Sequence, residues 1–473
     1  MTGSELDVAA RVVELVRRLA GPDAQAEVTV ARHQLALTRF ANSFIHQNVD
    51  EVGVAVRLRL HLGGRTAGGS GSLVDADGLT ALVERTVAAA RLAPADPAWP
   101  GLTPPTAVPP APPTDDATAQ ARPEDRAERV RAFVAAVGGL EAAGYCRTSS
   151  RHEAFANSAG HSATGRSAEA AMDGIARTGT ADGVARQHAD HLAELDGAVL
   201  GARAAAKARA AAEPVELPPG RYEVVFEPAA VSDLLQKLAW YGFNGKRYAE
   251  RQSFAEPGVA QFDPAVTLVD DPLHGSHLQF DLEGTPRRAV TLVDGGVTRA
   301  VVHDRRSAAG GASTGHAMAG SGTFGPLPHN LRLLPAPADP TTGSGHPAAS
   351  RAGVPAGGSV TGAVADPDTA ALVAGMARGL LVSDLWYTRV LDPKSLVVTG
   401  LTRNGVWLVE DGVPVRAVRD LRFTEAYPRA MGPGAVLGLG SAAVRQPDRT
   451  DGLWWAAPAV RLASWHFTGG ASG

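Results

Sequence analysis

The sequence predicts an α+β protein, in which an N-terminal α/β region is followed by a C-terminal β-barrel-like, antiparallel β domain. Over residues 1–213, amphipathic helical stretches alternate with strand-like stretches of period two. Over residues 218–473, short strand patterns dominate and Gly, Asp and Pro separate them, as in a barrel or sandwich. The chain has 473 residues and is 44% hydrophobic, enough for two or three domains with sizeable cores.

The N-terminal α/β domain is expected to span residues 1–93. Apolar residues between positions 8 and 19 fall on one helical face. The stretch Val52–Leu62 alternates apolar and polar residues, which is typical of a strand with one buried face. The pair Gly63–Gly64 then indicates a turn into a return strand, and residues 78–93 form a second predicted helix.

A proline-rich segment, residues 94–123, separates this domain from the next predicted elements. It holds ten prolines and almost no periodicity, so it is predicted to be a loop or a semi-rigid linker, most simply a spacer. The middle α/β segment, residues 124–213, is expected to pack with the N-terminal domain. It contains a predicted helix at 125–143, strands on both sides of Asn157–Gly160, and an alanine-rich helix at about 189–212.

The β-rich domain is expected over residues 214–473. Its strand patterns lie at Arg221–Phe226, Val290–Val293, Val297–Val302, Leu396–Leu401, Val406–Val409 and Val413–Val418. Helical stretches interrupt them around residues 228–241 and 367–379. Residues 335–365 are rich in Gly, Pro, Ala and Ser and predict a long mobile loop.

Composition excludes several classes of protein. The net charge of −4 argues against a dedicated nucleic-acid surface, which normally carries a basic excess. The sequence contains no apolar run of about 18 residues, so no membrane span is expected. No signal-peptide pattern is visible at the N-terminus. The single cysteine, Cys146, excludes an internal disulfide and a cysteine zinc cluster, and favours a reducing, cytoplasmic location. The excess of arginine over lysine is typical of a high-GC bacterial genome.

Segments along nearly the whole chain resemble one known family. The matching segments are Glu51–Arg57 with Gly63–Arg65 and Gly68, Phe155–Gly160, Leu217–Pro228, Asp281–Thr285, Leu292–Val297, Gly315–His316, Gly379–Ser383 and Gly405–Val415. In order and spacing they resemble the TldD/PmbA (modulator of DNA gyrase) metallopeptidase family. The resemblance implies an N-terminal α/β region, a C-terminal barrel-like domain and two-subunit assemblies. In these, a zinc-bearing subunit pairs with a TldE/PmbA-type subunit that lacks the zinc motif.

The zinc motif of the family's catalytic branch, His-Glu-x-x-x-His near the start of the C-terminal domain, is missing here. When this chain is aligned with the family motif, Gln236, Lys237 and Tyr241 fall at the positions of the motif's His, Glu and His. Glutamine is a poor zinc ligand, and a lysine puts a positive charge where the general base belongs. No histidine lies between His191 and His274, so the absence does not depend on the exact register.

The family's late cysteine is also absent, since the segment Arg445–Trp455 contains none. The resemblance therefore implies that this chain has no catalytic, cofactor-binding or metal residues of the family type. It implies that zinc belongs to the partner subunit.

Other histidines offer weaker candidates for a metal site. His188 and His191 have a spacing compatible with one helical face, but arginine-rich helices produce such pairs by chance. His274 and His277 lie in a turn-rich segment that is most simply an exposed loop. The pair His303–Asp304 follows an apolar strand and is most simply a hydrogen-bonded structural pair.

Nucleophilic chemistry has little support in the sequence. The glycine-rich stretch Gly315–Thr323 is not a nucleophile elbow, and it lacks the ending of a phosphate loop. Cys146 has no identifiable base and is expected to be buried. The late aromatic residues favour a β-domain core over a subunit interface; they are Trp386, Tyr387, Trp407, Tyr427, Trp454, Trp455, Trp465 and Phe467.

Two functions from different classes remain, with a third, blander one. The first is a non-catalytic partner of a zinc-bearing TldD-like subunit, which helps to hold an unfolded peptide by strand addition during a trimming step such as leader removal. The second is a stand-alone enzyme that reuses the family cavity on a peptide or natural product, with Lys237, Tyr241 or His274 as new reactive groups. The third is a homodimeric scaffold without activity.

Overall fold

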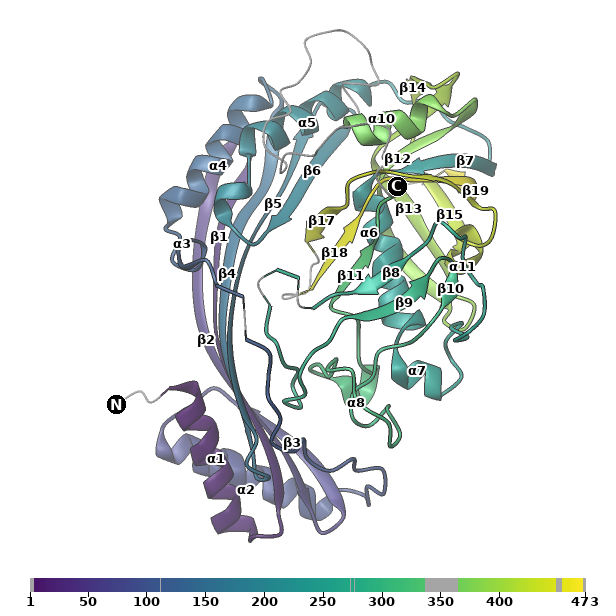
Figure 1. The fold of residues 1–473 in the computed structure, drawn as a ribbon. Helices are drawn as coiled ribbons and strands as arrows, with labels where there is room; N and C mark the ends of the chain where they lie inside the picture. The colour runs from purple at the N-terminus through teal and green to yellow at the C-terminus, as the bar shows by residue number, and fades with distance from the viewer. Residues whose placement is uncertain are drawn as a thin grey trace.

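The computed structural model describes residues 4–110, 112–272, 274–275, 277–336, 365–447 and 453–470. It contains one long curved sheet with helices on its outer side and a C-terminal domain on its concave side (Figure 1). The loop expected near residues 335–365 lies almost entirely outside the described residues. Within the described ranges, no helix is both long and apolar enough to cross a membrane.

The long sheet is antiparallel throughout, with strand order β3-β2-β1-β4-β5-β6. Its strands are β1 (Gln25–Ala41), β2 (Phe44–Leu62), β3 (Arg65–Gly71), β4 (Glu141–Asn157), β5 (Ser162–Arg177) and β6 (Asp182–Ala189). β1 pairs with β4 from Glu27 to Phe40, so the segments expected at 1–93 and 124–213 contribute to one continuous sheet.

Helices cover the two ends of the outer face of this sheet. The helices are α1 (Glu5–Ala20), α2 (Ala76–Leu92), α3 (Asp116–Ala119), α4 (Pro123–Ala136) and α5 (Gly197–Ala210), and a short 3₁₀ helix, η1 (Leu192–Glu194), precedes α5. α1 begins with a capping box at Ser4 and buries Val8, Val12 and Val16, as its 3.6-residue periodicity predicts. Separate apolar cores form under the α1–α2 pair and under the α4–α5 pair.

Three predicted helices are shorter than expected, each for a local reason. The helix expected at 125–143 ends at Ala136, because Gly138 and Gly139 adopt positive φ and β4 follows. The helix expected at 189–212 begins only at Gly197, after Asp196 caps it. The helix expected at 367–379 ends at Ala374, because the next residues enter a barrel strand.

The C-terminal domain contains two sheets. One has the order β10-β9-β8-β11-β18-β17, with β8 (Leu268–Asp270), β9 (Val290–Asp294), β10 (Val297–Thr298), β11 (Asn330–Leu333), β17 (Val444–Pro447) and β18 (Trp454–Ala457). The other closes into a five-stranded barrel through the pairing of β12 with β13. Its strands are β7 (Gly220–Phe226), β12 (Arg378–Asp392), β13 (Val397–Glu410), β15 (Leu421–Ala426) and β19 (Val460–Gly470). β14 (Val413–Ala417) and β16 (Val436–Leu439) extend this sheet.

The barrel confirms the predicted fold class and corrects one strand assignment. The two strands expected at Leu396–Leu401 and Val406–Val409 form the single strand β13, which passes through positive φ at Asn404 and Gly405. Most of the late aromatic side chains are core, and Trp407, Trp454, Trp455, Trp465, Tyr427 and Phe467 are buried. The two exceptions are Trp386, which is half-buried, and Tyr387, with 62% of its surface exposed.

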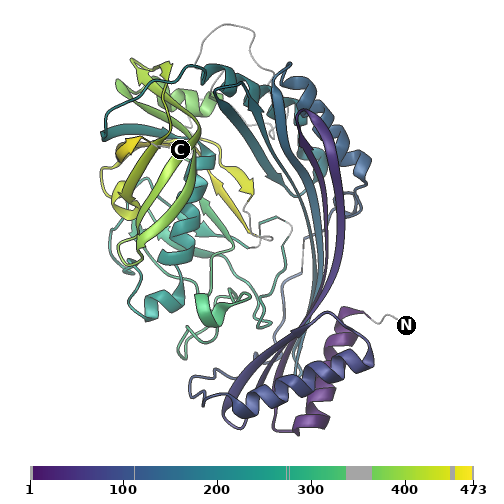
Figure 2. The ribbon, with the colours of Figure 1, turned by 180° about the vertical axis from the view of Figure 1, so that it is seen from behind.

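The C-terminal domain also contains helices, which lie beside its barrel and its second sheet. They are α6 (Pro228–Lys237), the π-helical turn η2 (Leu238–Gly242), α7 (Gly245–Ala249), α8 (Ser321–Phe324), α10 (Pro367–Ala374) and α11 (Tyr427–Ala430). The view from behind shows the C-terminal domain on the concave side of the long sheet (Figure 2), and within that domain α6 packs between barrel strand β12 and strands β11, β17 and β18 of the second sheet.

The segment expected to be a spacer, residues 94–123, is packed between the two parts of the molecule. Asp96 forms a bidentate ion pair with Arg306, and the hydroxyl of buried Thr103 donates to the carbonyl of Glu283 at 2.6 Å. The segment therefore fastens the C-terminal domain to the sheet as well as connecting them in sequence.

Candidate functional site

The three positions that the sequence resemblance aligns with the zinc motif, Gln236, Lys237 and Tyr241, lie at the end of α6 and in η2. Pro228 occupies the first turn of α6, where its fixed φ favours helix initiation. The helix buries Val231, Leu234 and Leu235 in the domain core and leaves the side chain of Lys237 half-buried on the other face. Tyr241 belongs to the π-turn, an irregularity that is frequent at functional sites.

Lys237 is held in a polar cluster around Asp233. The Lys237 Nζ lies 3.7 Å from Asp233 Oδ1 and donates to Gln236 Oε1 at 2.6 Å. Asp233 also accepts from the hydroxyl of Thr388 at 2.6 Å and from the hydroxyl of Tyr427 at 3.0 Å. Burial and the neighbouring Asp233 raise the pKa of Tyr427 well above its usual value, so this phenol stays a hydrogen-bond donor.

These residues do not fit a zinc ion. A catalytic zinc needs three protein donors such as imidazole, thiolate or carboxylate, and the three motif positions supply an amide, an ammonium and a phenol. The ring of Tyr241 is moreover covered by the Arg247 guanidinium, 4.5 Å from its centroid. In the described part of the chain, no group of three or more His, Cys, Asp and Glu side chains is placed to hold a metal.

The structure does not bring the other histidine candidates together. His188 lies in β6 and contacts buried Glu169 at 2.9 Å, whereas His191 is half exposed and contacts Asp115 at 3.1 Å. The helical spacing proposed for this pair is wrong, because β6 continues to Ala189.

The second pair, His274 and His277, also separates. His274 is exposed, as expected for a loop, but His277 is buried and its Nε2 contacts the amide of Asn330 at 2.8 Å. Burial lowers the pKa of His277 to about 4, so the ring is neutral near pH 7. His303 and Asp304 do not bond each other; both contact Ser307.

The two candidates for nucleophilic chemistry are structural. In the Gly315–Thr323 stretch, His316 is fully buried, with its Nε2 2.6 Å from Asp270 Oδ2 and its Nδ1 2.8 Å from the Thr314 hydroxyl. Cys146 lies in the core under α4, and burial raises the pKa of its thiol to about 12. A thiol with that pKa is not a nucleophile near neutral pH.

A cavity of about 450 Å³ lies between the long sheet and the C-terminal domain. The sheet side of its wall is Glu27, Thr29, Arg57, Leu58, Arg59 and the β3 residues Thr66–Ser70, and the other side is Leu282, Glu283 and Ala317–Gly322. Its volume is within the roughly 300–1,000 Å³ that ligand pockets commonly have.

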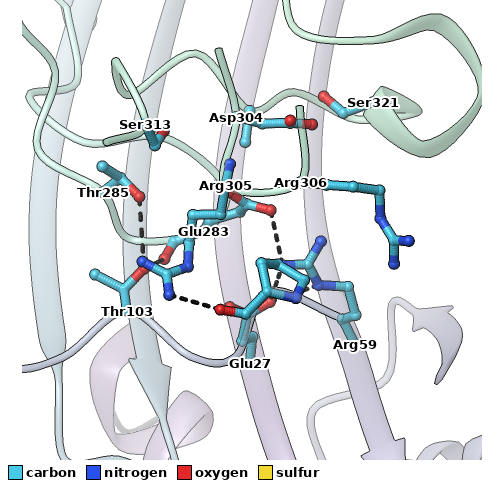
Figure 3. A network of polar contacts seen from close by, with 12 residues as sticks. Glu27, Arg59, Thr103, Glu283, Thr285, Asp304, Arg305, Arg306, Ser313 and Ser321 are labelled. Atoms are coloured by element: carbon cyan, nitrogen blue, oxygen red, sulfur yellow. Dashed lines mark hydrogen bonds and ion pairs between the residues drawn. The ribbon is translucent and has the colours of Figure 1, made fainter. Parts of the chain in front are cut away.

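A charged network lies at the bottom of this cavity. The guanidinium of Arg59 contacts Glu27 Oε2 at 2.5 Å and Glu283 Oε1 at 2.8 Å, and Figure 3 shows the three side chains converging from β1, β2 and the 281–285 loop. Glu283 Oε2 accepts from the backbone N–H of Arg305 at 2.8 Å. Burial raises the pKa of Glu27 to about 7, although Arg59 opposes that shift.

The loop that lines the cavity is contacted from behind by residues beside and after the motif positions, Trp240 and Asn244. The ring of Trp240, in η2, packs edge-on against Phe324 of α8 with centroids 6.2 Å apart, and the Asn244 amide donates to the Phe324 carbonyl at 2.7 Å. The loop that ends in α8 lines the cavity on its other side. The sequence did not indicate this site, because Glu27 and Glu283 lie in segments far apart in the chain, and of the three charged residues only Arg59 lies in a predicted strand.

Comparison with known proteins agrees with this architecture. Residues 219–438 match the family model described as the PmbA/TldA metallopeptidase C-terminal domain. No curated protein matches the sequence.

Three crystal structures are similar over nearly the whole chain. TldE from Thermococcus kodakarensis is 17% identical, with a TM-score of 0.81, and the match covers 98% of this chain and 100% of that one. A candidate modulator of DNA gyrase from Bacteroides thetaiotaomicron is 15% identical, with a TM-score of 0.78 and 98% of each chain covered. Another, from Thermotoga maritima, is 15% identical, with a TM-score of 0.76 and coverage of 98% and 99%.

The C-terminal domain expected from the sequence motifs is therefore confirmed: residues 219–438 form a PmbA/TldA metallopeptidase C-terminal domain, and the chain as a whole has the fold of TldE.

Proposed function

We propose that this chain is the non-catalytic, TldE/PmbA-like subunit of a TldD/TldE-type zinc metalloprotease complex. In that complex a TldD-like partner supplies zinc and the general base, and this chain helps to bind unfolded peptides for processing, such as leader removal from a modified peptide. We expect both subunits to be cytoplasmic.

One observation carries the proposal: the position of the family's metal site is occupied by an internal ion pair. Lys237 aligns with the expected general base and forms an ion pair with Asp233 in the preceding turn. Asp233 in turn accepts hydrogen bonds from the hydroxyls of Thr388 and Tyr427. A cluster whose hydrogen bonds are already satisfied stabilises the domain but has no spare base for hydrolysis.

Peptide binding is supported by open strand edges next to the cavity. β3 pairs only with residues Val56–Leu62 of β2, so the Phe44–Ala55 part of β2 has no second neighbouring strand among the described residues. The outer edge of β3 is likewise free of strand partners beyond a single bridge from Arg65 to Ala95. Such edges bind extended peptides through backbone groups and so tolerate many sequences.

The same cluster disfavours a stand-alone enzyme built on Lys237, Tyr241 or His274. Lys237 is ion-paired, Tyr241 is stacked under Arg247, and His274 is exposed, with its backbone N–H bonded to the carbonyl of Asp271. A lysine that acts as a base or nucleophile needs a lowered pKa and no matched carboxylate.

Co-purification with a family member that carries His-Glu-x-x-x-His tests the proposal. We expect a stable complex in which only the pair cleaves an unfolded peptide and a zinc chelator abolishes the cleavage. Lys237→Met is the matched control, because it removes the amine at the position aligned with the family's general base; cleavage by the pair should survive it. Cleavage by the isolated chain that survives the chelator but not Lys237→Met would instead establish the stand-alone enzyme.

A further inference from the structure

The cavity between the long sheet and the C-terminal domain contains a polar atom that the protein leaves without a partner. Glu27 Oε1 is buried and has no hydrogen-bond partner, whereas Oε2 of the same carboxylate is bound by Arg59. The side chain of Glu27 is only 3% exposed, so bulk water does not freely solvate it. Native proteins rarely leave such atoms unpaired, and the exceptions are frequent where a ligand binds.

The surrounding charges do not supply the missing donor. Arg59 is shared between Glu27 and Glu283, and Glu283 has a partner on each of its oxygens. The next guanidinium, that of Arg305, donates to the carbonyls of Pro100 and Leu102 in the connecting segment. The remaining acceptor, Glu27 Oε1, is therefore free for a donor from outside, and a cationic donor gives the strongest bond to a carboxylate.

The walls of the cavity suit an extended chain with small side chains. On one side runs β3, whose residues Gly68, Gly69 and Ser70 present little side-chain bulk beside an open backbone edge. On the other side lies the Ala317–Gly322 loop, which is also built from small residues apart from Met318. A main chain can approach backbone closely only where side chains are this small.

We propose that this cavity binds a primary ammonium group of an extended peptide, with Glu27 Oε1 as its acceptor and the edge of β3 beside the peptide backbone. The proposal rests on the peptide-binding role given above and names the group that is recognised. The ammonium can come from the peptide's N-terminus or from a lysine side chain.

Calorimetric titration of the isolated chain with three peptide amides tests this. The probes are pentaalanine with a free N-terminus, N-acetyl-pentaalanine, and N-acetyl-Ala-Ala-Lys-Ala-Ala. We expect at least one ammonium-bearing peptide to bind roughly tenfold more tightly than N-acetyl-pentaalanine, the ratio that one charge-assisted hydrogen bond gives. The tighter of the two identifies the source of the ammonium. Equal affinity for all three peptides, or no binding of any, would overturn the proposal.

Two variants locate the contact. Glu27→Gln should remove the preference for the ammonium peptides and leave the affinity for N-acetyl-pentaalanine unchanged. Glu283→Gln is the matched control: it removes the same charge from the same network, but from a carboxylate whose oxygens are both occupied. It should retain most of the preference. Equal losses in the two variants would mean that the network's overall charge, and not Glu27, attracts the peptide.

A measurement on the unaltered chain keeps the proposal falsifiable if Glu27→Gln does not fold. Arg59, Glu283 and Arg305 face Glu27, and Arg57 lines the same cavity, and together with burial they leave the pKa of Glu27 at about 7. Affinity for the lysine peptide should therefore rise as the pH increases from 6 to 8, and a flat profile contradicts the assignment. None of these titrations involves the zinc-bearing partner, so a failed co-purification and a failed titration are separate results.

Discussion

The ammonium of Lys237 lies 3.7 Å from the carboxylate of Asp233, one turn earlier on α6. Asp233 also accepts hydrogen bonds from Thr388 of strand β12 and Tyr427 of α11. The pair therefore contributes to the packing of this domain, at positions that the sequence resemblance aligns with the family's zinc motif.

Asp233→Ala is expected to destabilise the protein by about 2–4 kcal/mol, because it leaves the hydroxyls of Thr388 and Tyr427 and the ammonium of Lys237 without their acceptor. Chemical denaturation measures the change. Asp392→Ala is the control: that carboxylate is exposed and caps only its own turn, so its loss should cost far less. Equal costs would show that the cluster is not a structural element.

Metal removal should not change the stability of the isolated chain. The motif positions offer an amide, an ammonium and a phenol, so a zinc chelator has no ion to withdraw from them. Thermal unfolding with and without chelator, together with elemental analysis, measures this. Stoichiometric zinc, or a lower unfolding temperature in chelator, would contradict the placement of Gln236, Lys237 and Tyr241.

The raised pKa of Glu27 predicts a pH-dependent stability. An acid whose pKa is about 7 in the folded state and near 4.5 in the unfolded chain binds more protons when folded, so its contribution is present at low pH and is lost as the pH rises from 4.5 to 7. Glu27→Gln does not titrate. Relative to the unaltered protein, its unfolding free energy should therefore improve over that window, by at most about 3 kcal/mol. A parallel pH dependence of the two proteins would refute the raised pKa.

Lys207 in α5 forms a buried ion pair with Glu227, the residue before α6, and also donates to Ser383 at 2.8 Å. Lys207→Met should cost about 3 kcal/mol, because the buried Glu227 carboxylate then keeps Arg203 as its remaining cationic partner. The double variant Lys207→Met/Glu227→Gln should recover part of that loss, since the buried carboxylate charge is gone. A double variant no more stable than the single one would show that the cost is one of packing.

Sequence alone determined the fold class, the resemblance of the C-terminal domain to the PmbA/TldA model and the absence of a His-Glu-x-x-x-His motif. Helix α1 and strand β7 follow from local periodicity, and the missing histidines between His191 and His274 are a property of the chain that no folding alters. Local patterns were less reliable at the ends of elements. Asp196 caps a helix that the alanine-rich composition extended too far, and the turn at Asn404–Gly405 lies inside one strand.

Only the tertiary structure decided where the polar groups lie. Arg59 and Glu283 are separated by more than two hundred residues and meet because the long sheet curves around the C-terminal domain. Such contacts depend on strand register and on burial, and neither the spacing of residues nor their types encodes these directly. Lys237 differs in part: Asp233 lies four residues earlier on the same helix, so their pairing is local, and only the contacts of Asp233 with β12 and α11 depend on the tertiary structure.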